Sequence, residues 1–219
     1  MWLIKKIISA GNDHKKTRLH DEKGKMANWQ VIFAHSPKAI FSGFKRILFG
    51  IRPEMPWIGY GAIKVLKKFL TKKSRVLEFG SGMSTIWYAK HGGEVFSVEN
   101  DPMWYAIILN RLKNKNIKNV NYQLLRTKNY INFMKKEKRG FDLIVIDGMD
   151  RDKCAKNAIK LIRPGGIIYL DNSDSLYKRA AETILLSFAR KRKAQVEYFV
   201  DFAPAQFFVN EGMMIRVPG

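Results

Sequence analysis

Cysteine, acidic residues and long apolar runs are all scarce in this sequence. Cys154 is the only cysteine among 219 residues, which excludes an intramolecular disulfide and a zinc site built from several cysteines. A reducing compartment follows, and we expect a cytoplasmic protein. The N-terminal run MWLIKKIISAG is interrupted by Lys5 and Lys6, and it is too short for a signal-peptide core or a bilayer span.

The shortage of acidic residues leaves the chain strongly basic. Nineteen Asp and Glu residues stand against 40 Lys and Arg residues, which gives a formal net charge of +21. Such a charge favours phosphate-rich partners or anionic membrane surfaces, although solvated lysines on helix faces produce the same excess without a partner. The charge therefore leaves the fold undecided and the partner open.

Residues 1–52 read as a basic, partly amphipathic N-terminal extension without sustained periodicity. Four apolar residues between Leu3 and Ile8 fall at helical spacing with lysines on the other side, and AIFSGFKRILFGI repeats the pattern before Pro53. These segments would suit the interface of an anionic membrane, which would make the protein peripheral at the inner face. Alternatively, they cover a face of the main domain or a dimer partner.

Beyond residue 53 the pattern alternates between short β-rich runs and helical runs. The expected strands are 75–79, 94–99, 120–125, 141–147 and 166–171, and the expected helices are 57–70, 84–91, 102–113, 128–138, 151–162 and roughly 175–192. Strands that alternate with helices of this length predict crossover units and a parallel sheet covered on both faces. At the C-terminus, QVEYFVDF and GMMIRVP are separated by too few residues for a crossover helix, so we expect an antiparallel hairpin at the sheet edge.

A glycine turn follows the first expected strand, in LEFGSGMST. Gly80 and Gly82 fit the dinucleotide fingerprint, but Thr85 stands at its last position. Glu78 precedes the turn, where its carboxylate could engage an ammonium group directly or through water. Glu99 ends the second strand, where it could accept hydrogen bonds from ribose hydroxyls. Together these residues suit a nucleoside joined to a zwitterionic amino acid, which is the shape of S-adenosylmethionine.

The runs VLEFGSGMSTIWYA and VFSVENDPMWY resemble class I S-adenosylmethionine-dependent methyltransferases, in particular a bacterial branch with a Gly-Ser-Gly-x-Ser-Thr loop. The resemblance implies a Rossmann-like, doubly wound α/β sheet of order 3-2-1-4-5-7-6 in a methyltransferase domain over residues 53–219. Ser84 stands where the broader family has a third glycine, and Thr127 or a backbone carbonyl could contact the adenine. The implied cofactor-binding residues are Glu78, Gly80, Ser81, Gly82, Ser84, Thr85, Glu99 and Asn100.

The ends of the fourth and fifth strands carry a second resemblance. Asp147, Asp171 and Asn172 are similar to the set by which cation-dependent, catechol-type O-methyltransferases hold magnesium, and the two aspartates would then be catalytic. The pattern departs from that family at Asp150, which stands where those enzymes have a lysine; the base is then missing, moved to Lys153, or unnecessary. Metal-independent relatives also keep an acid at the position of Asp147, so cation use stays open.

Four other residues have plain structural interpretations beside functional ones. Cys154 lies among apolar neighbours and is expected in the core. His91 could act as a base, but at the end of a helix it also complements the helix dipole. Trp104 and Tyr105 could flank the adenine or could simply pack as core aromatics.

The acceptor of the methyl group separates three function classes. The first is an O-methyltransferase for a small-molecule, saccharide or lipid-linked acceptor that is hydroxylated or anionic. The second is an RNA methyltransferase that uses the basic surface, although no RNA-binding module is recognisable and IDGMD is not the motif of base-amine methylation. The third is a non-catalytic cofactor-binding scaffold. The first is favoured, and the sequence does not predict the oligomeric state.

Overall fold

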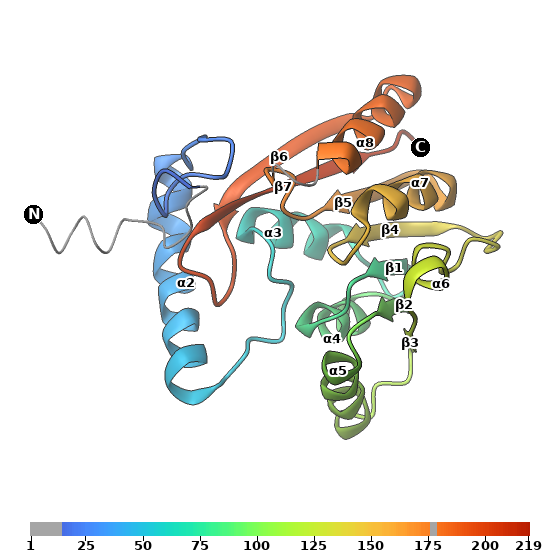
Figure 1. Cartoon of the computed structure of the whole chain (residues 1–219), viewed down its shortest axis with the longest axis horizontal. Helices are drawn as coiled ribbons and strands as arrows, with labels where there is room; N and C mark the ends of the chain where they lie inside the picture. Colours follow the sequence, from blue (N-terminus) through green and yellow to red (C-terminus); the bar gives the residue numbers. More distant parts are fainter. Residues whose placement is uncertain (1–14, 176–178) are drawn as a thin grey trace, which may run out of the picture.

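A computed structural model describes residues 15–175 and 179–219, and Figure 1 shows how their elements are arranged. Seven strands form one sheet in the order β3-β2-β1-β4-β5-β7-β6. The strands are β1 (Arg75–Phe79), β2 (Glu94–Glu99), β3 (Val120–Leu124), β4 (Phe141–Ile146), β5 (Ile162–Leu170), β6 (Gln195–Phe202) and β7 (Val209–Arg216). The helices are α2 (Trp29–Phe49), α3 (Tyr60–Phe69), α4 (Met83–His91), α5 (Pro102–Asn114), α6 (Thr127–Ile131), α7 (Arg151–Leu161) and α8 (Arg179–Arg192).

The predicted sheet is confirmed, both in its order and in its mixture of parallel and antiparallel pairs. The five strands from β3 to β5 pair in parallel, whereas β7 is antiparallel to both β5 and β6. The central strands RVLEF and FDLIVI are almost wholly buried because helices cover both faces. Parallel pairing brings the carboxyl ends of these strands together at one edge.

Two helical layers enclose the sheet. One face packs against α6, α7 and α8 around a large cluster that includes Ile144, Ile168 and Leu185. The other face packs against α3, α4 and α5, with Leu66 and Ile108 among the fully buried side chains. The sandwich holds the strand ends rigidly, and the connections that follow those ends supply the residues of the candidate site.

Two elements beyond residue 53 differ from the sequence expectation. The helix expected over 128–138 is only Thr127–Ile131, because the polar stretch after it folds into turns and Met134 adopts a positive φ of 57°. Strand β5 begins at Ile162 rather than at residue 166. Its pairing with β4 contains a register shift, and Gly165 within it has a φ of 74°. A β-bulge of this kind follows from tertiary pairing, which local periodicity does not report.

The N-terminal region packs on the C-terminal hairpin. Instead of short irregular clusters, residues 29–49 form the single 21-residue helix α2, which contains Pro37. The side chain of Asn28 caps its start, and Gly50 ends it in a left-handed conformation. The helix lies along β6, where His35 pairs with Asp201 at 2.8 Å. The apolar run between Leu3 and Ile8 lies outside the described residues.

Candidate functional site

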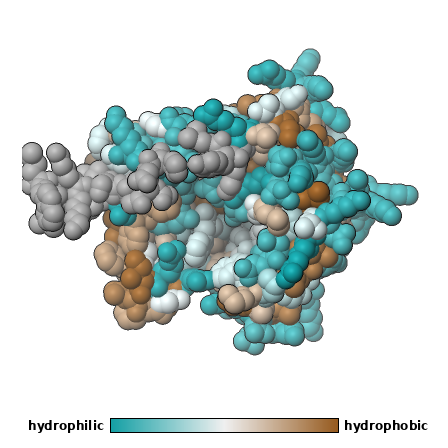
Figure 2. All heavy atoms as spheres, in the orientation of Figure 1, coloured by the Kyte–Doolittle hydropathy of each residue, from teal (hydrophilic) through white to brown (hydrophobic). Residues whose placement is uncertain are grey.

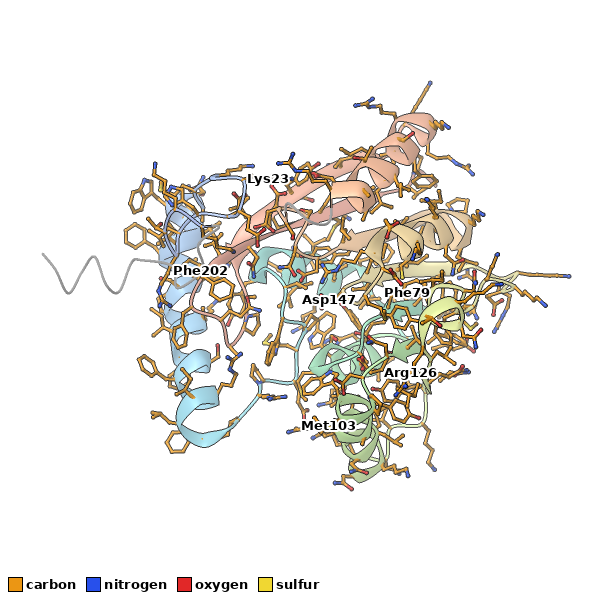
Figure 3. The ribbon with its side chains drawn as sticks, viewed as in Figure 1. Lys23, Phe79, Met103, Arg126, Asp147 and Phe202 are labelled. Carbon is orange, nitrogen blue, oxygen red and sulfur yellow. The ribbon has the colours of Figure 1, made fainter. Side chains whose placement is uncertain are left out.

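The predicted site residues gather where the central strands end. The backbone N–H of Asp147 donates to the carbonyl of Phe79 at 2.9 Å, and that of Asp171 donates to the carbonyl of Ile146 at 3.1 Å. These bonds connect the end of β1 to the end of β4, and the end of β4 to the end of β5. In Figure 3, Asp147 lies centrally, on the side of the sheet that faces α2. Open α/β sheets bind ligands at this edge.

Gly80 is required by the geometry of the turn after β1. Its φ is +92°, and a Cβ at this position would lie 2.6 Å from the backbone nitrogen of Gly148. The turn therefore fits directly against the connection that follows β4. Gly82 is different, because its φ of −177° is ordinary extended backbone and an added Cβ would meet nothing closer than Ser84 Oγ at 3.4 Å. Gly82 therefore leaves open space beside the turn, and no backbone strain requires a glycine there.

Glu78 lies beneath the turn with its carboxylate directed into the protein. Its exposed fraction is 1%, and it accepts hydrogen bonds from the hydroxyls of Ser84 (2.5 Å), Thr85 (2.6 Å) and Ser97 (2.6 Å). Burial raises the pKa of Glu78 to about 7 against the lowering effect of these three donors. The carboxylate thus fastens the first turn of α4 to β1 and β2. Its predicted contact with an ammonium group stays a prediction.

Glu99 holds the turn from the neighbouring strand. One carboxylate oxygen accepts from the backbone N–H of Ser81 (3.1 Å) and from the Ser81 hydroxyl (2.7 Å). The other accepts from the backbone N–H groups of Asn100 (2.8 Å) and Asp101 (3.0 Å). Both oxygens of Glu99 are thus bonded within the protein, and its predicted contact with ribose hydroxyls stays a prediction.

Aromatic side chains stand beside Ser81 and Glu99. The indole N–H of Trp104 donates to the carbonyl of Ser81 at 2.8 Å, and the hydroxyl of Tyr122 lies 2.7 Å from Ser81 Oγ. Tyr105 stacks on Tyr122 with 4.5 Å between the ring centroids. The sequence singled out Trp104 and Tyr105; Tyr122 was missed, because a tyrosine in a short strand carries no signal before the strand's neighbours are known.

The second group of predicted residues surrounds a side chain that the sequence did not single out. Arg151, the first residue of α7, is 7% exposed, and its guanidinium donates to Asp147 Oδ1 at 3.0 Å. It also donates to the backbone carbonyls of Asp147, Gly148 and Asp171, and it lies 3.5 Å from Asn172 Oδ1. Within the set that the resemblance assigned to magnesium, the guanidinium thus reaches side-chain oxygens of Asp147 and Asn172 and the backbone carbonyl of Asp171.

This arrangement does not fit a divalent cation. The guanidinium already supplies the positive charge and the donors for these oxygens, and a hard cation there would face it at close range. Burial and the Asp147 carboxylate also raise the pKa of Asp171 well above its ordinary value. Within residues 15–175 and 179–219, no group of three or more His, Cys, Asp or Glu side chains is placed to hold a metal. The structure therefore gives no support to a magnesium site at Asp147, Asp171 and Asn172.

Cys154 and His91 have structural contacts, whereas the predicted adenine contact of Thr127 stays a prediction. Cys154 is fully buried, as expected, and burial raises the pKa of its thiol to about 12. His91 stacks on Trp87 at 4.1 Å and its Nδ1 lies 2.8 Å from the Trp87 carbonyl at the end of α4. Thr127 is exposed at the start of α6 with a φ of 46°.

A groove of about 640 Å³ lies between α2 and β6, and none of the predicted site residues lines it.

Comparison with known proteins places the fold. No protein-family model matches the chain, and no curated protein matches its sequence. Among solved structures, the O-methyltransferase TomG from Streptomyces achromogenes, in complex with S-adenosylmethionine, is 17% identical, with a TM-score of 0.59 over 88% of this chain and 100% of that chain. An O-methyltransferase from Bacillus cereus, in complex with S-adenosylhomocysteine, is 19% identical, with a TM-score of 0.58 over 83% and 98%.

An rRNA methylase from Streptococcus thermophilus shares the fold as well. It is 13% identical, and the match has a TM-score of 0.56 over 71% of this chain and 93% of that chain. At these identities the likeness establishes the fold. The chain has the Rossmann-like architecture of class I methyltransferases, with the predicted strand order.

Proposed function

We propose that the protein is an S-adenosylmethionine-dependent methyltransferase that methylates an oxygen acceptor. The observation that carries the proposal is the contact of the glycine turn with Glu99, through Ser81, at the carboxyl ends of β1 and β2. Two O-methyltransferases of the same fold have been solved in complex with S-adenosylmethionine or its demethylated product.

The residues at the turn fit each part of this cofactor. Glu99, which already accepts a hydroxyl donor, would bind the ribose, and Gly82 leaves the N-terminus of α4 open to the carboxylate. Trp104 and Tyr122 would border the adenine. The cofactor supplies an electrophilic methyl group on a sulfonium, so the protein needs to align an acceptor and receive its proton.

Asp147 is the residue best placed for the acceptor. Its side chain is 37% exposed at the centre of the strand ends, and Arg151 holds one of its oxygens. The other oxygen would accept the proton of an acceptor hydroxyl. Asp171 is buried beside it and would act as a positioning residue for the Asp147 side chain. In this proposal the guanidinium of Arg151 takes the electrostatic place of a cation, and the reaction needs no divalent metal.

RNA is the second candidate acceptor. The net charge of +21 and the likeness to an rRNA methylase favour it. The two candidates are separated by following tritium from methyl-labelled S-adenosylmethionine into total RNA, hydroxylated small molecules, saccharides and lipid-linked saccharides.

We expect label in a hydroxylated or lipid-linked acceptor, at the same rate with and without EDTA. Asp147→Asn should lower the rate at least about a hundredfold, as is typical for loss of a general base. The partly exposed neighbour Asp150, whose carboxylate pairs with Lys153, provides the control Asp150→Asn, which should change the rate little. Label in RNA alone, or activity that EDTA abolishes, would overturn the proposal.

A further inference from the structure

Helix α2 leaves a large apolar surface uncovered. Nine of the fourteen exposed large hydrophobic side chains of the described residues fall within residues 29–51. Figure 2 shows hydrophobic residues gathered over the position of α2. We call these nine residues the outer face of α2, although Trp29 also borders the groove beside β6 and Ile51 follows the end of the helix. They are Trp29, Phe33, Ile40, Phe41, Phe44, Ile47, Leu48, Phe49 and Ile51. Exposed patches of this kind mark interaction surfaces in soluble domains.

The opposite side of the helix is fixed to the protein. Ile32 and Ala39 are buried against β6, and Gly43 is so close to Phe207 that an added Cβ would lie 2.5 Å from the ring. The hydroxyl of Ser42 accepts from the backbone N–H of Ala205 at 2.9 Å. Since the inner side is anchored in this way, the outer face is presented to the surroundings in a fixed orientation.

The charges around the outer face all have one sign. Helix α2 contains no acidic residue, and its charged residues are Lys38, Lys45 and Arg46. Lys38 and Lys45 are exposed, seven residues apart on the same side of α2, and Lys45 Nζ lies 4.4 Å from the centre of the Phe41 ring. Aromatic and aliphatic side chains bordered by lysines are the composition of helices that lie in a membrane interface.

We propose that the outer face of α2 docks on an anionic lipid membrane. Charge complementarity selects this occupant, because two copies of a chain with a net charge of +21 would bring two basic helix surfaces without acidic residues together. In the described part of the chain, no helix has the length and hydropathy to cross a bilayer. The helix would therefore lie in the headgroup region, with its phenylalanines inserted and its lysines against lipid phosphates. This inference does not depend on the proposed methyl transfer.

Vesicle sedimentation of the full-length protein tests the proposal. The vesicles contain either phosphatidylcholine alone or phosphatidylcholine mixed with phosphatidylglycerol, whose anionic headgroups attract basic segments. We expect binding to the anionic vesicles only, weakening as salt rises. Lys38→Glu/Lys45→Glu and Phe33→Gln/Leu48→Gln should each lower the partition coefficient by more than about tenfold, through lost electrostatic attraction and lost apolar burial respectively.

A charge-matched variant separates the α2 surface from the overall charge. Lys156 and Lys160 are exposed on α7, on the other layer of the sandwich, so Lys156→Glu/Lys160→Glu makes the same change in net charge. It should bind nearly as well as the wild type. Equal losses in both charge variants, no preference for anionic vesicles, or a dimer that dissociates in Phe33→Gln/Leu48→Gln would overturn the proposal.

Discussion

Arg151 shows how one side chain changes the chemistry expected of a site. The sequence placed two aspartates and an asparagine at neighbouring strand ends, and the set matched a magnesium site. Nothing in the sequence indicated that the arginine four residues after Asp147 would turn back under the strand ends, because that direction depends on where α7 begins. Its bonds to Asp147 and to three backbone carbonyls make it the cation of this site.

Removal of the Arg151 side chain should therefore lower the free energy of unfolding. Arg151→Ala leaves the Asp147 carboxylate without its partner and three carbonyls without donors, and we expect a loss of about 3 kcal/mol in the free energy of unfolding. Lys153→Ala, which removes an exposed cation two residues later, should change it by less than about 0.5 kcal/mol. Urea unfolding measures both. If Mg²⁺ raised the melting temperature of the wild type, and Asp147→Asn abolished that rise, Arg151 would not be the resident cation.

The raised pKa of Glu78 predicts that the free energy of unfolding depends on pH. Burial raises its pKa from 4.5 to about 7 in the folded state, so the folded protein holds this proton more tightly than the unfolded chain. The resulting stabilisation is complete below pH 4.5 and is lost as pH rises toward 7. Unfolding free energies of the wild type and of Glu78→Gln, measured from pH 5 to 8, should show the wild type losing about 2 kcal/mol relative to the variant. A difference that does not change with pH would contradict this description of Glu78.

The turn between β1 and α4 is the element on which the site depends. Its two glycines look equivalent in the sequence, but only Gly80 has a positive φ and a close backbone neighbour. The glycine motif in the sequence was therefore enough to locate the turn. The different roles of Gly80 and Gly82 depend on the connection after β4, which packs against Gly80 and is far from it in sequence.

Alanine substitution should separate these tasks. Gly80→Ala combines a strained φ with a collision at Gly148, so we expect a loss of more than about 2 kcal/mol in unfolding free energy. Gly82→Ala should fold with nearly the wild-type stability and lose affinity for S-adenosylmethionine, because its Cβ occupies ligand space. Thermal melts combined with cofactor titration test both variants. Equal stability losses would show that the two positions are structurally alike.

Among the other elements, agreement with the sequence follows the strength of the local pattern. The central strands and the amphipathic helices were predicted within a few residues, because burial on one or both faces dictates their periodicity. The long helix α2 was not, since it contains Pro37 and carries apolar residues on its outer face as well as its inner one. Its contacts with β6 and with the loop after β6 come from residues more than 150 positions away, which no local window can detect.

At the scale of the whole molecule, the sheet positions the candidate site, whereas the uncovered face of α2 carries the proposed membrane contact. The order of strands brings the glycine turn, Glu99 and Asp147 to one edge, and this arrangement was predictable from alternation and motif order. The uncovered face of α2 was not predictable in detail, because exposure depends on which side of the helix the C-terminal hairpin covers. A basic, apolar face of this kind would favour a lipid-linked acceptor if membrane docking is observed.

The central claim is that the turn after β1 holds S-adenosylmethionine, and calorimetric titration with this cofactor tests it most directly. Wild-type protein should bind, and Glu99→Gln should bind at least about tenfold more weakly, since a hydrogen bond to a charged group contributes about 1.5–3 kcal/mol. Glu197→Gln, which changes an exposed carboxylate on β6, serves as the control and should bind like the wild type. A folded wild-type protein that binds no S-adenosylmethionine, or equal affinities for all three proteins, would contradict the account.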